Sequence, residues 1–201
     1  GITLGEDGAS HQSIEDIALM RSIPGMTVLQ PSDDIETKQM IKAISEFDGP
    51  CYVRLGRSAV ETVNAEDYKF ELGKGVVLRE GKDITLIATG MMVQEAMKAS
   101  TLLAEQGIEV SVINIHTIKP LDETLILDFA KRSKLVVTCE EHSKFGGLGS
   151  AVAETLSKNH PTKMAMVAVN DTFGESGTPA ALIEKYGLTA KDIVETVIGS
   201  I

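Results

Sequence analysis

Five ionisable residues near the start of the chain have the types and spacing to bind a phosphorylated small molecule. Three of them, Glu6, Asp7 and His11, share one glycine-rich turn. Arg54 and Arg57 stand at, or just past, the end of a short apolar run that we expect to form a strand. Guanidinium groups match phosphate oxygens, and a histidine adds a further hydrogen bond. Because a carboxylate repels phosphate, the expected partner of Asp7 is a neutral donor such as a sugar hydroxyl.

Spacing alone leaves a second interpretation open, in which the same charges form surface salt bridges around a turn. Topology favours a ligand, because open α/β sheets bind ligands at the carboxyl ends of their strands. The chain also lacks an initiator methionine and opens inside the glycine-rich pattern, so we expect it to be part of a larger working unit.

The composition is that of an acidic globular chain. Of its 201 residues, 43% are hydrophobic and 24% are charged, and the formal net charge is −10. This balance is typical of a protein with a buried core, and it argues against nucleic acid, which calls for a basic face. No apolar run approaches the ~20 residues of a membrane span, so we expect no membrane association and a cytoplasmic location. Cys51 and Cys139 are predicted to be buried, reduced thiols.

Short apolar runs alternate with helical patterns along the chain. The runs are rich in β-branched residues and nearly continuous, which is typical of strands buried on both faces of a parallel sheet. We therefore expect an α/β fold with right-handed crossovers. The predicted strands are Met26–Leu29, Cys51–Leu55, Ile84–Ala88, Val110–Ile115, Leu135–Cys139 and Met164–Val169.

Helices are predicted between these strands. Ser13 is expected to cap the first, and Gly107 is expected to end the third. The second begins near Ser32, and its apolar side chains are Met40, Ile41, Ile44 and Phe47. The others are predicted at about 91–105, 121–131, 148–158, 179–186 and 190–198.

A polar segment between Gly56 and Lys74 breaks the alternation of strands and helices. We interpret residues 61–71 as a linker between two α/β units, residues 1–60 and residues 72–201. The first unit then has only two or three strands, too few for an open sheet with two covered faces. It is therefore expected to be the second half of a domain.

The opening motif carries a resemblance to a known family. The run Gly5-Glu-Asp-Gly-Ala-Ser-His-Gln12, followed by Met20-Arg-Ser-Ile-Pro24 and Val28-Leu-Gln-Pro-Ser-Asp33, resembles the second half of the transketolase pyrimidine-binding domain. Later motifs resemble the transketolase C-terminal domain: Glu140-Glu-His142, Gly146-Gly-Leu-Gly-Ser-Ala151, Phe173-Gly174, Gly177 and Tyr186-Gly-Leu-Thr189. The resemblance covers essentially the whole chain. It implies a partial pyrimidine-binding α/β unit, then a C-terminal domain with a mostly parallel five-stranded sheet flanked by helices.

The resemblance implies roles for the site residues by position. Asp7 would contact a hydroxyl of the ketose donor near the carbonyl, while His11 and Arg57 would bind the sugar phosphate. Glu6 is expected to be structural. Arg54 is an extra positive charge that is similar to one in deoxyxylulose phosphate synthases and would also bind substrate; the alternative is a surface arginine at a strand end.

The same resemblance implies thiamine diphosphate and Mg²⁺ as cofactors of the complete enzyme. The domain that binds the diphosphate and the metal, and the residues around the aminopyrimidine ring, would lie outside residues 1–201. We therefore expect no catalytic or metal-ligating residue in this chain, no cofactor bound by it alone, and no activity of the isolated chain. The expected partners are sugar phosphates, a second protomer and the diphosphate-binding domain or subunit, in a homodimer or a split-subunit heterotetramer.

Two further motifs are interpreted as structural. Gly146-Gly-Leu-Gly149 follows a predicted strand and precedes a helix, where it would either cradle a phosphate or permit tight packing, and we favour packing. Glu140-Glu-His142 has residue types that bind metals, but three consecutive residues of a strand cannot all face one ion. We expect hydrogen-bonded or interface roles there.

The implied activity is transfer of a two-carbon ketol unit between sugar phosphates, as in the pentose phosphate pathway. Three alternatives stay open. Deoxyxylulose phosphate synthases share an Asp-Gly-x-x-His element and are favoured by Arg54, whereas Gln12 and the Glu6–Asp7 pair favour transketolase. The beta subunits of 2-oxo acid dehydrogenases lack the full motif. The third alternative is a non-catalytic regulatory or assembly module.

Overall fold

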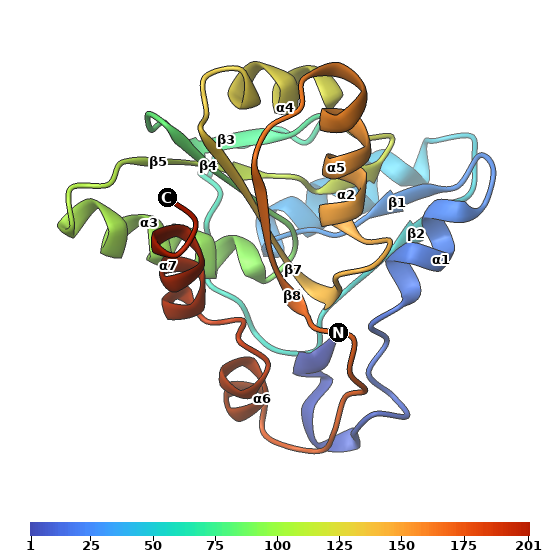
Figure 1. Cartoon of the computed structure of the whole chain (residues 1–201). Helices are drawn as coiled ribbons and strands as arrows, with labels where there is room; N and C mark the ends of the chain where they lie inside the picture. Colours follow the sequence, from blue (N-terminus) through green and yellow to red (C-terminus); the bar gives the residue numbers. More distant parts are fainter.

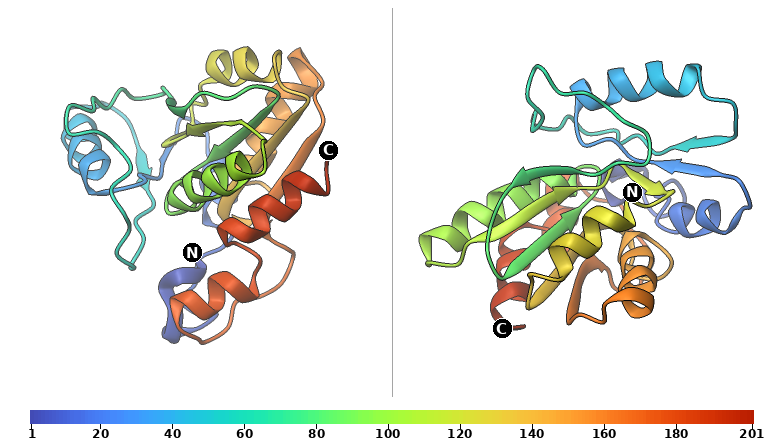
Figure 2. Two further views of the ribbon diagram at one scale, coloured as in Figure 1. Left: turned by 90° about the vertical axis from the view of Figure 1, so that its left-hand side faces the viewer. Right: turned by 90° about the horizontal axis from the view of Figure 1, so that it is seen from above.

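The computed structural model describes residues 1–201 and contains two sheets (Figure 1). The smaller sheet has the strand order β2-β1-β6, and the larger has the order β3-β5-β4-β7-β8. Seen from above, the smaller sheet and α2 stand to one side of the larger sheet (Figure 2). In the larger sheet only β3 runs antiparallel to its neighbour. The expected α/β fold with a mostly parallel five-stranded sheet is therefore confirmed.

Both faces of the larger sheet are covered by helices. Its strands are β3 (Val76–Arg79), β4 (Ile84–Ala88), β5 (Val110–Asn114), β7 (Leu135–Ser143) and β8 (Met164–Val169). On one face they pack against α3 (Met92–Glu105) and α7 (Ala190–Ile198), while α6 (Pro179–Lys185) lies beyond the edge of the sheet and packs against the N-terminal segment. On the other they pack against α4 (Glu123–Ala130) and α5 (Leu148–Asn159).

The continuous apolar runs follow from this double coverage. Neighbouring residues of a strand point to opposite faces, so Leu86 joins the α3 side of the core while Ile87 joins the α4 side. Both side chains are fully buried. A strand with helices on both faces therefore favours apolar residues at successive positions, and the buried polar side chains of these strands, such as Thr85 and Ser111, are the exceptions.

The smaller sheet draws strands from both parts of the chain. β1 (Thr27–Leu29) and β2 (Cys51–Val53) pair in parallel, and β6 (Thr117–Lys119) joins β1 antiparallel. Two helices belong to this part, α1 (Asp16–Ser22) and α2 (Asp34–Ser45). The chain opens with the 3-10 segment η1 (Ile2–Asp7), which packs against α6 near the C-terminal end of the fold. Strand β6 thus ties the later part of the chain to the earlier part.

The predicted linker has no helix or strand, yet it is held against α2. The Asp33 carboxylate caps α2 through the N–H of Glu36 and also accepts from the N–H groups of Val63 (2.9 Å) and Asn64 (2.8 Å). The Tyr68 hydroxyl donates to Glu36 Oε1 at 2.7 Å. The division of the chain at residues 61–71 stays a prediction.

Several local predictions were wrong because tertiary contacts decide them. Ser13 does not cap α1, because the helix begins at Asp16 and Glu15 is its N-cap residue. The backbone at Ser13 instead accepts a hydrogen bond from Arg54 through its carbonyl. Cys51 is only half-buried because β2 is an edge strand. Strands β3 and β6 were not predicted, being short and antiparallel. On α2 the side chain of Met40 is fully buried but that of Ile41 is exposed, and Phe47, also exposed, lies beyond the end of the helix.

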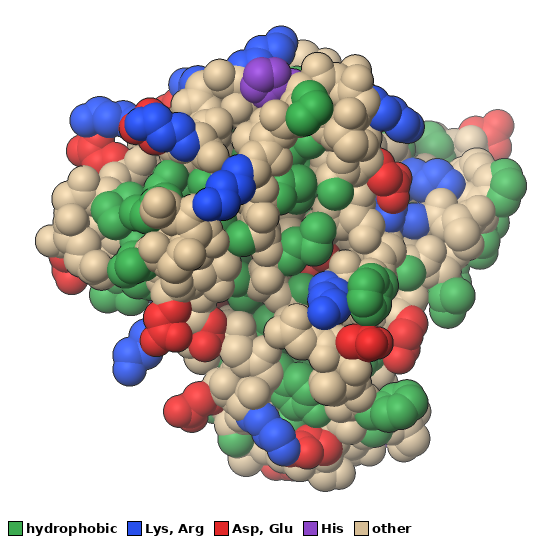
Figure 3. Space-filling view, in the orientation of Figure 1, with side chains coloured by type: hydrophobic (Ala, Val, Ile, Leu, Met, Phe, Trp, Pro, Cys, Tyr) green, Lys and Arg blue, Asp and Glu red, His purple; other side chains and the backbone are tan.

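Two observations concern nucleic acid and membranes, the two partner classes that the composition argues against. On the face shown in Figure 3, basic and acidic side chains are interspersed and do not gather into a broad basic patch. None of the helices has the length and the apolar character to cross a membrane.

Candidate functional site

The loop that carries Asp7 and His11 is folded by its glycines. Gly5 and Gly8 have φ angles of 85° and 77°, a region that side-chain-bearing residues rarely adopt. The turn is closed by backbone hydrogen bonds from the N–H groups of His11 and Gln12 to the carbonyl of Gly8, at 3.0 and 3.2 Å. As a result the side chains of Asp7 and His11 are exposed rather than turned into the core.

The side chains of Asp7 and Arg57 form an ion pair. Arg57 lies beyond the end of β2, on the segment that follows Val53. The Asp7 and Arg57 side chains are 44% and 58% exposed, so both remain available to a ligand. Because a guanidinium has five N–H donors, a contact with Asp7 leaves others free for phosphate oxygens.

His11 has a neighbour that sets its orientation. Ser10 Oγ lies 3.0 Å from His11 Nδ1. When the Ser10 hydroxyl donates this hydrogen bond, Nε2 carries the proton and is a donor toward a ligand. Ser10 was not singled out in the sequence, where a serine beside a histidine is too common a pair to be a signal.

One cavity of about 830 Å³ brings three of the four predicted site residues together. His11, Arg54 and Arg57 line it, and Asp7 is joined to it through Arg57. Its remaining wall includes the segments after β1, β2 and β4, parts of η1 and α2, and Glu141 of β7. The cavity therefore lies at the carboxyl ends of β1 and β2, where open α/β sheets bind ligands.

Arg54 lies in the floor of this cavity rather than at its surface. It is 6% exposed, and its Nε donates to Asp16 Oδ2 at 2.9 Å. Its Nη2 donates to the carbonyls of Ser13 (2.8 Å) and Glu141 (2.9 Å). The surface-arginine alternative is therefore wrong. One buried side chain joins β2, the start of α1 and β7.

Asp16 and Tyr52 complete the buried group around Arg54 and were missed in the sequence. The Tyr52 hydroxyl donates to Asp16 Oδ2 at 2.6 Å. Burial acts to raise the pKa of Asp16, but the Arg54 guanidinium and the hydrogen bonds from Tyr52 and Arg54 hold that pKa below its usual value. Burial and the bond to Asp16 raise the pKa of Tyr52 to about 12. At neutral pH the group is thus a carboxylate, a guanidinium and a neutral phenol.

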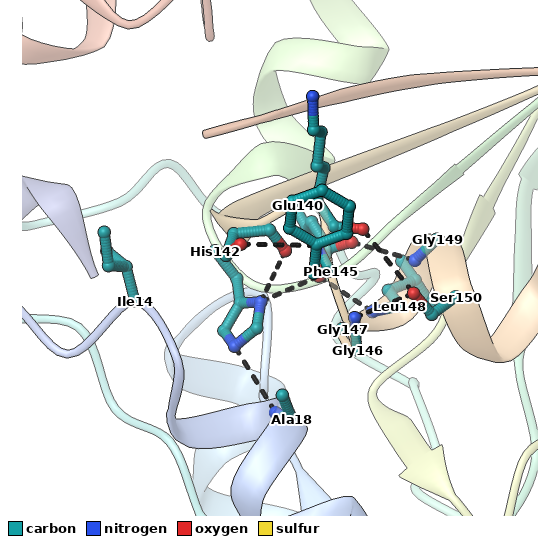
Figure 4. Close-up of polar contacts among 12 residues, drawn as sticks. Ile14, Ala18, Glu140, His142, Phe145, Gly146, Gly147, Leu148, Gly149 and Ser150 are labelled. Carbon is teal, nitrogen blue, oxygen red and sulfur yellow. Dashed lines mark hydrogen bonds and ion pairs between the residues drawn. The ribbon is translucent and has the colours of Figure 1, made fainter. Parts of the chain in front are cut away.

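The Glu140–His142 segment holds the two parts of the chain together (Figure 4). Glu140 is fully buried, and its carboxylate accepts from the N–H groups of Leu148 (2.7 Å) and Gly149 (2.8 Å) at the start of α5. Burial raises the pKa of Glu140 to about 7. His142 Nε2 accepts from the N–H of Ala18 in α1 at 3.4 Å. These residues have structural hydrogen-bonded roles, as the sequence suggested.

The glycine turn before α5 does not fit a diphosphate. The backbone N–H groups that would hold an anion there already bind the Glu140 carboxylate, which would also repel it. No group of three or more His, Cys, Asp or Glu side chains is arranged to hold a metal ion. Tight packing is evident instead, because a Cβ on Gly146 would stand 2.5 Å from the Cβ of Ala18.

Comparison with known proteins decides the family. Residues 1–62 match the model of the transketolase pyrimidine-binding domain, and residues 73–193 match that of the transketolase C-terminal domain. The chain belongs to the transketolase family. Enzymes of this family depend on thiamine diphosphate, and this chain is a C-terminal section of the family's architecture.

Similar proteins include separate transketolase subunits. A protein of Methanocaldococcus jannaschii described as a transketolase C-terminal section is 47% identical over 98% of this chain and 63% of its own length. A 6-deoxy-6-sulfo-D-fructose transketolase subunit of a Clostridium species is 48% identical over 96% of this chain and 60% of its own. This chain therefore spans about three fifths of these relatives.

A solved structure shares the fold closely. A split-gene transketolase, described as an inactive β4 tetramer, superimposes with a TM-score of 0.90 at 47% identity, over 96% of this chain and 62% of that one. Deoxyxylulose phosphate synthases are also similar: that of Desulforudis audaxviator is 40% identical over 98% of this chain but only 32% of its own length.

Proposed function

We propose that this transketolase-family chain supplies the phosphate-binding end of the sugar channel in a two-carbon ketol transfer. The observation that carries the proposal is the joint position of His11 and Arg57 on one 830 Å³ cavity, with Arg57 paired to Asp7. Two cationic or hydrogen-bonding groups suit the phosphate, and the adjacent carboxylate suits a sugar hydroxyl.

Each residue has a distinct task in this proposal. Arg57 and His11 hold the phosphate, which places the sugar along the cavity. Asp7, kept in place by Arg57, accepts a hydrogen bond from a donor hydroxyl. Arg54 holds the cavity floor through Asp16, and its remaining donor capacity extends the anion-binding wall. The sugar is thereby oriented before any bond is broken.

The carbanion chemistry belongs to thiamine diphosphate, which supplies it when bound to the complete enzyme. The glycine turn before α5 does not suit the diphosphate, and no group of three or more His, Cys, Asp or Glu side chains is arranged for its Mg²⁺. We therefore propose that a diphosphate-binding domain or subunit assembles with this chain in a split-subunit heterotetramer or a homodimer. A cytoplasmic location and a role in the pentose phosphate pathway are parts of the same proposal.

The deoxyxylulose phosphate synthase alternative stays open, because such synthases are among the similar proteins. Arg54, the residue that favoured it, lines the cavity, and its Nε and Nη2 groups donate to Asp16, Ser13 and Glu141. A sulfonate, like a phosphate, is an anion with three oxygens around a tetrahedral centre, so the same pair of residues also suits sulfo-sugars. The proposal is therefore a ketol transfer with an anionic sugar.

The test replaces His11 with alanine in the complete enzyme. A lost charge-assisted hydrogen bond is worth about 1.5–3 kcal/mol, so KM for a phosphorylated donor should rise by about tenfold or more. The KM for a donor without a phosphate should stay unchanged. His160→Ala is the matched control, because His160 lies at the end of α5, outside the cavity lining. An unchanged KM for the phosphorylated donor would remove His11 from the anion site.

A further inference from the structure

The Gln12 side chain joins the substrate loop to a distant part of the chain. Gln12 is 4% exposed, and its Nε2 lies within hydrogen-bonding distance of three backbone carbonyls. Two belong to η1, Ile2 at 3.1 Å and Gly5 at 3.2 Å. The third, at 2.9 Å, belongs to Glu175, in the segment between β8 and α6. One amide thus fastens both ends of the loop and a segment 163 residues further on.

The orientation of this amide is determined by its surroundings. Three carbonyls around the NH₂ group exclude the flipped orientation, which would set an oxygen against oxygens. Gln12 Oε1 is buried and has no hydrogen-bond partner. The hydrogen bonds that the NH₂ group donates therefore have to offset the cost of burying the unpaired Oε1 atom.

Shape reinforces the hydrogen bonds on both sides of the contact. A Cβ on Gly174 would stand 1.9 Å from Gln12 Oε1, so that position accepts only glycine while Gln12 stays where it is. A Cβ on Gly8 would stand 2.6 Å from Ser176 Oγ. In Figures 1 and 2 the N-terminal loop lies alongside the segment that leads into α6. The loop and the segment 174–176 therefore fit each other closely.

We propose that Gln12 is a positioning residue that clamps the loop carrying Asp7 and His11 onto the segment 174–176, and thereby sets the affinity for the anionic sugar. The inference rests on the proposed function of His11. It gives the C-terminal domain a task beyond assembly, because the backbone of Glu175 is the anchor of the clamp.

The clamp acts through the backbone immediately before Gln12. His11 adjoins Gln12, and both their N–H groups bond to the Gly8 carbonyl in the same turn. When the amide of residue 12 loses its donors, this turn is released from η1 and from Glu175. The His11 side chain then samples more orientations, which weakens binding without touching the groups that react.

The primary test is Gln12→Met in the complete enzyme, since methionine keeps the length of the side chain and removes its donors. We expect KM for a phosphorylated donor to rise about five- to twentyfold, with kcat within twofold of the wild type. Hydrogen exchange at the amides of His11 and Gln12 should quicken by at least tenfold, while exchange in β4 should not change. Exchange reports the clamp without any reliance on activity.

A second variant reaches the clamp from the opposite side. Gly174→Ala displaces the Gln12 amide although no residue of the substrate loop itself is substituted. It should reproduce the rise in KM and the faster exchange. Glu175→Ala is the matched control: it removes the ion pair with Lys185 but keeps the carbonyl that Gln12 uses, so both readouts should stay at wild-type values.

The outcomes separate this inference from the function on which it rests. Unchanged exchange at His11 and Gln12 in both variants would overturn the clamp. Faster exchange together with an unchanged KM would leave the clamp as described but overturn its link to affinity, whereas the phosphate role of His11 is decided separately by KM in His11→Ala. A fall in kcat with an unchanged KM would assign Gln12 to general structure and overturn the inference as well.

Discussion

Asp7 and Arg57 form an ion pair although 50 positions separate them in the chain. Both side chains remain about half exposed, and exposed pairs of this kind contribute only about 0–1 kcal/mol to stability. The pair is therefore a poor candidate for holding the fold together. Its position beside the cavity suits the orientation of two groups toward a ligand.

The first prediction concerns Arg57. Arg57→Ala should raise KM for phosphorylated sugars by more than tenfold, because the phosphate loses a cationic partner, while the melting temperature changes by less than about 2 °C. Steady-state kinetics and thermal unfolding measure the two effects. Arg132→Ala is the control, since Arg132 forms a similarly exposed ion pair with Glu80 outside the cavity. A wild-type KM in the Arg57 variant would exclude it from the anion site.

The second prediction concerns Asp7. Asp7→Ala should weaken the discrimination between donor ketoses that differ at one hydroxyl, because a hydrogen bond to that hydroxyl gives such selectivity and its loss costs about tenfold or more. The measurement is the ratio of kcat/KM for two such donors. Glu6→Ala is the matched control, as Glu6 is the neighbouring exposed acid. An unaltered ratio in the Asp7 variant would show that Asp7 has no contact with the donor.

The third prediction concerns pH and the buried pair of Asp16 and Arg54. The pKa of Asp16 is lower in the folded protein than its ordinary value of 3.8, so the ionised group stabilises the fold above that value. This contribution is lost as pH falls through 3.8 and below. In urea unfolding, the wild type should exceed Asp16→Asn in stability by a constant amount above pH 5, about 3–5 kcal/mol for a broken buried pair.

The same experiment contains its own check. Between about pH 5 and pH 2 the difference in stability between the wild type and Asp16→Asn should shrink. Protonation removes the negative charge of Asp16 from the wild type, and the substitution has already removed that charge from the variant. Lys38 and Asp34 offer the control: their pair is exposed, and Asp34→Asn should leave the stability close to that of the wild type throughout this pH range. A difference that stays constant down to pH 2 would refute an ionised Asp16 in the fold.

The fourth prediction concerns the isolated chain. Purified residues 1–201 should show no ketol transfer with thiamine diphosphate and Mg²⁺, because no side-chain group here holds a metal and the α5 start is occupied by Glu140. Activity is expected only when both the diphosphate-binding domain or subunit and the residues around the aminopyrimidine ring are supplied as well. A coupled assay of sugar phosphate turnover measures both. Turnover by the isolated chain would contradict the proposed division of labour.

Much of the element order and the turn that carries Asp7 and His11 were predictable because both are local, whereas the roles of the site residues stay predictions. The buried strands β4, β5, β7 and β8 follow from continuous apolar runs, and a carboxylate at position 33 predicts the start of α2. The Gly5–Gln12 motif predicts a tight turn, since positive φ angles at Gly5 and Gly8 need no contact with the remainder of the chain.

Contacts between distant segments were not predictable in the same way. Ser13 has every local property of a helix cap, yet its carbonyl serves Arg54 and the helix begins three residues later. Strand β6 has only three residues and forms because β1 offers it an edge. Such elements owe their existence to a neighbour that the local pattern does not reveal.

The sequence by itself determined the family, the α/β class and the identity of the groups that suit an anionic sugar, because these depend on residue types at short, fixed spacings. Only the tertiary structure decided what each group does. It paired Asp7 with Arg57, sank Arg54 into the cavity floor against Asp16, and set Gln12 against Glu175. The physical reason is that burial and hydrogen-bond partners depend on distances in space and not on positions in the sequence. Gln12, for example, donates a hydrogen bond to a carbonyl 163 positions away.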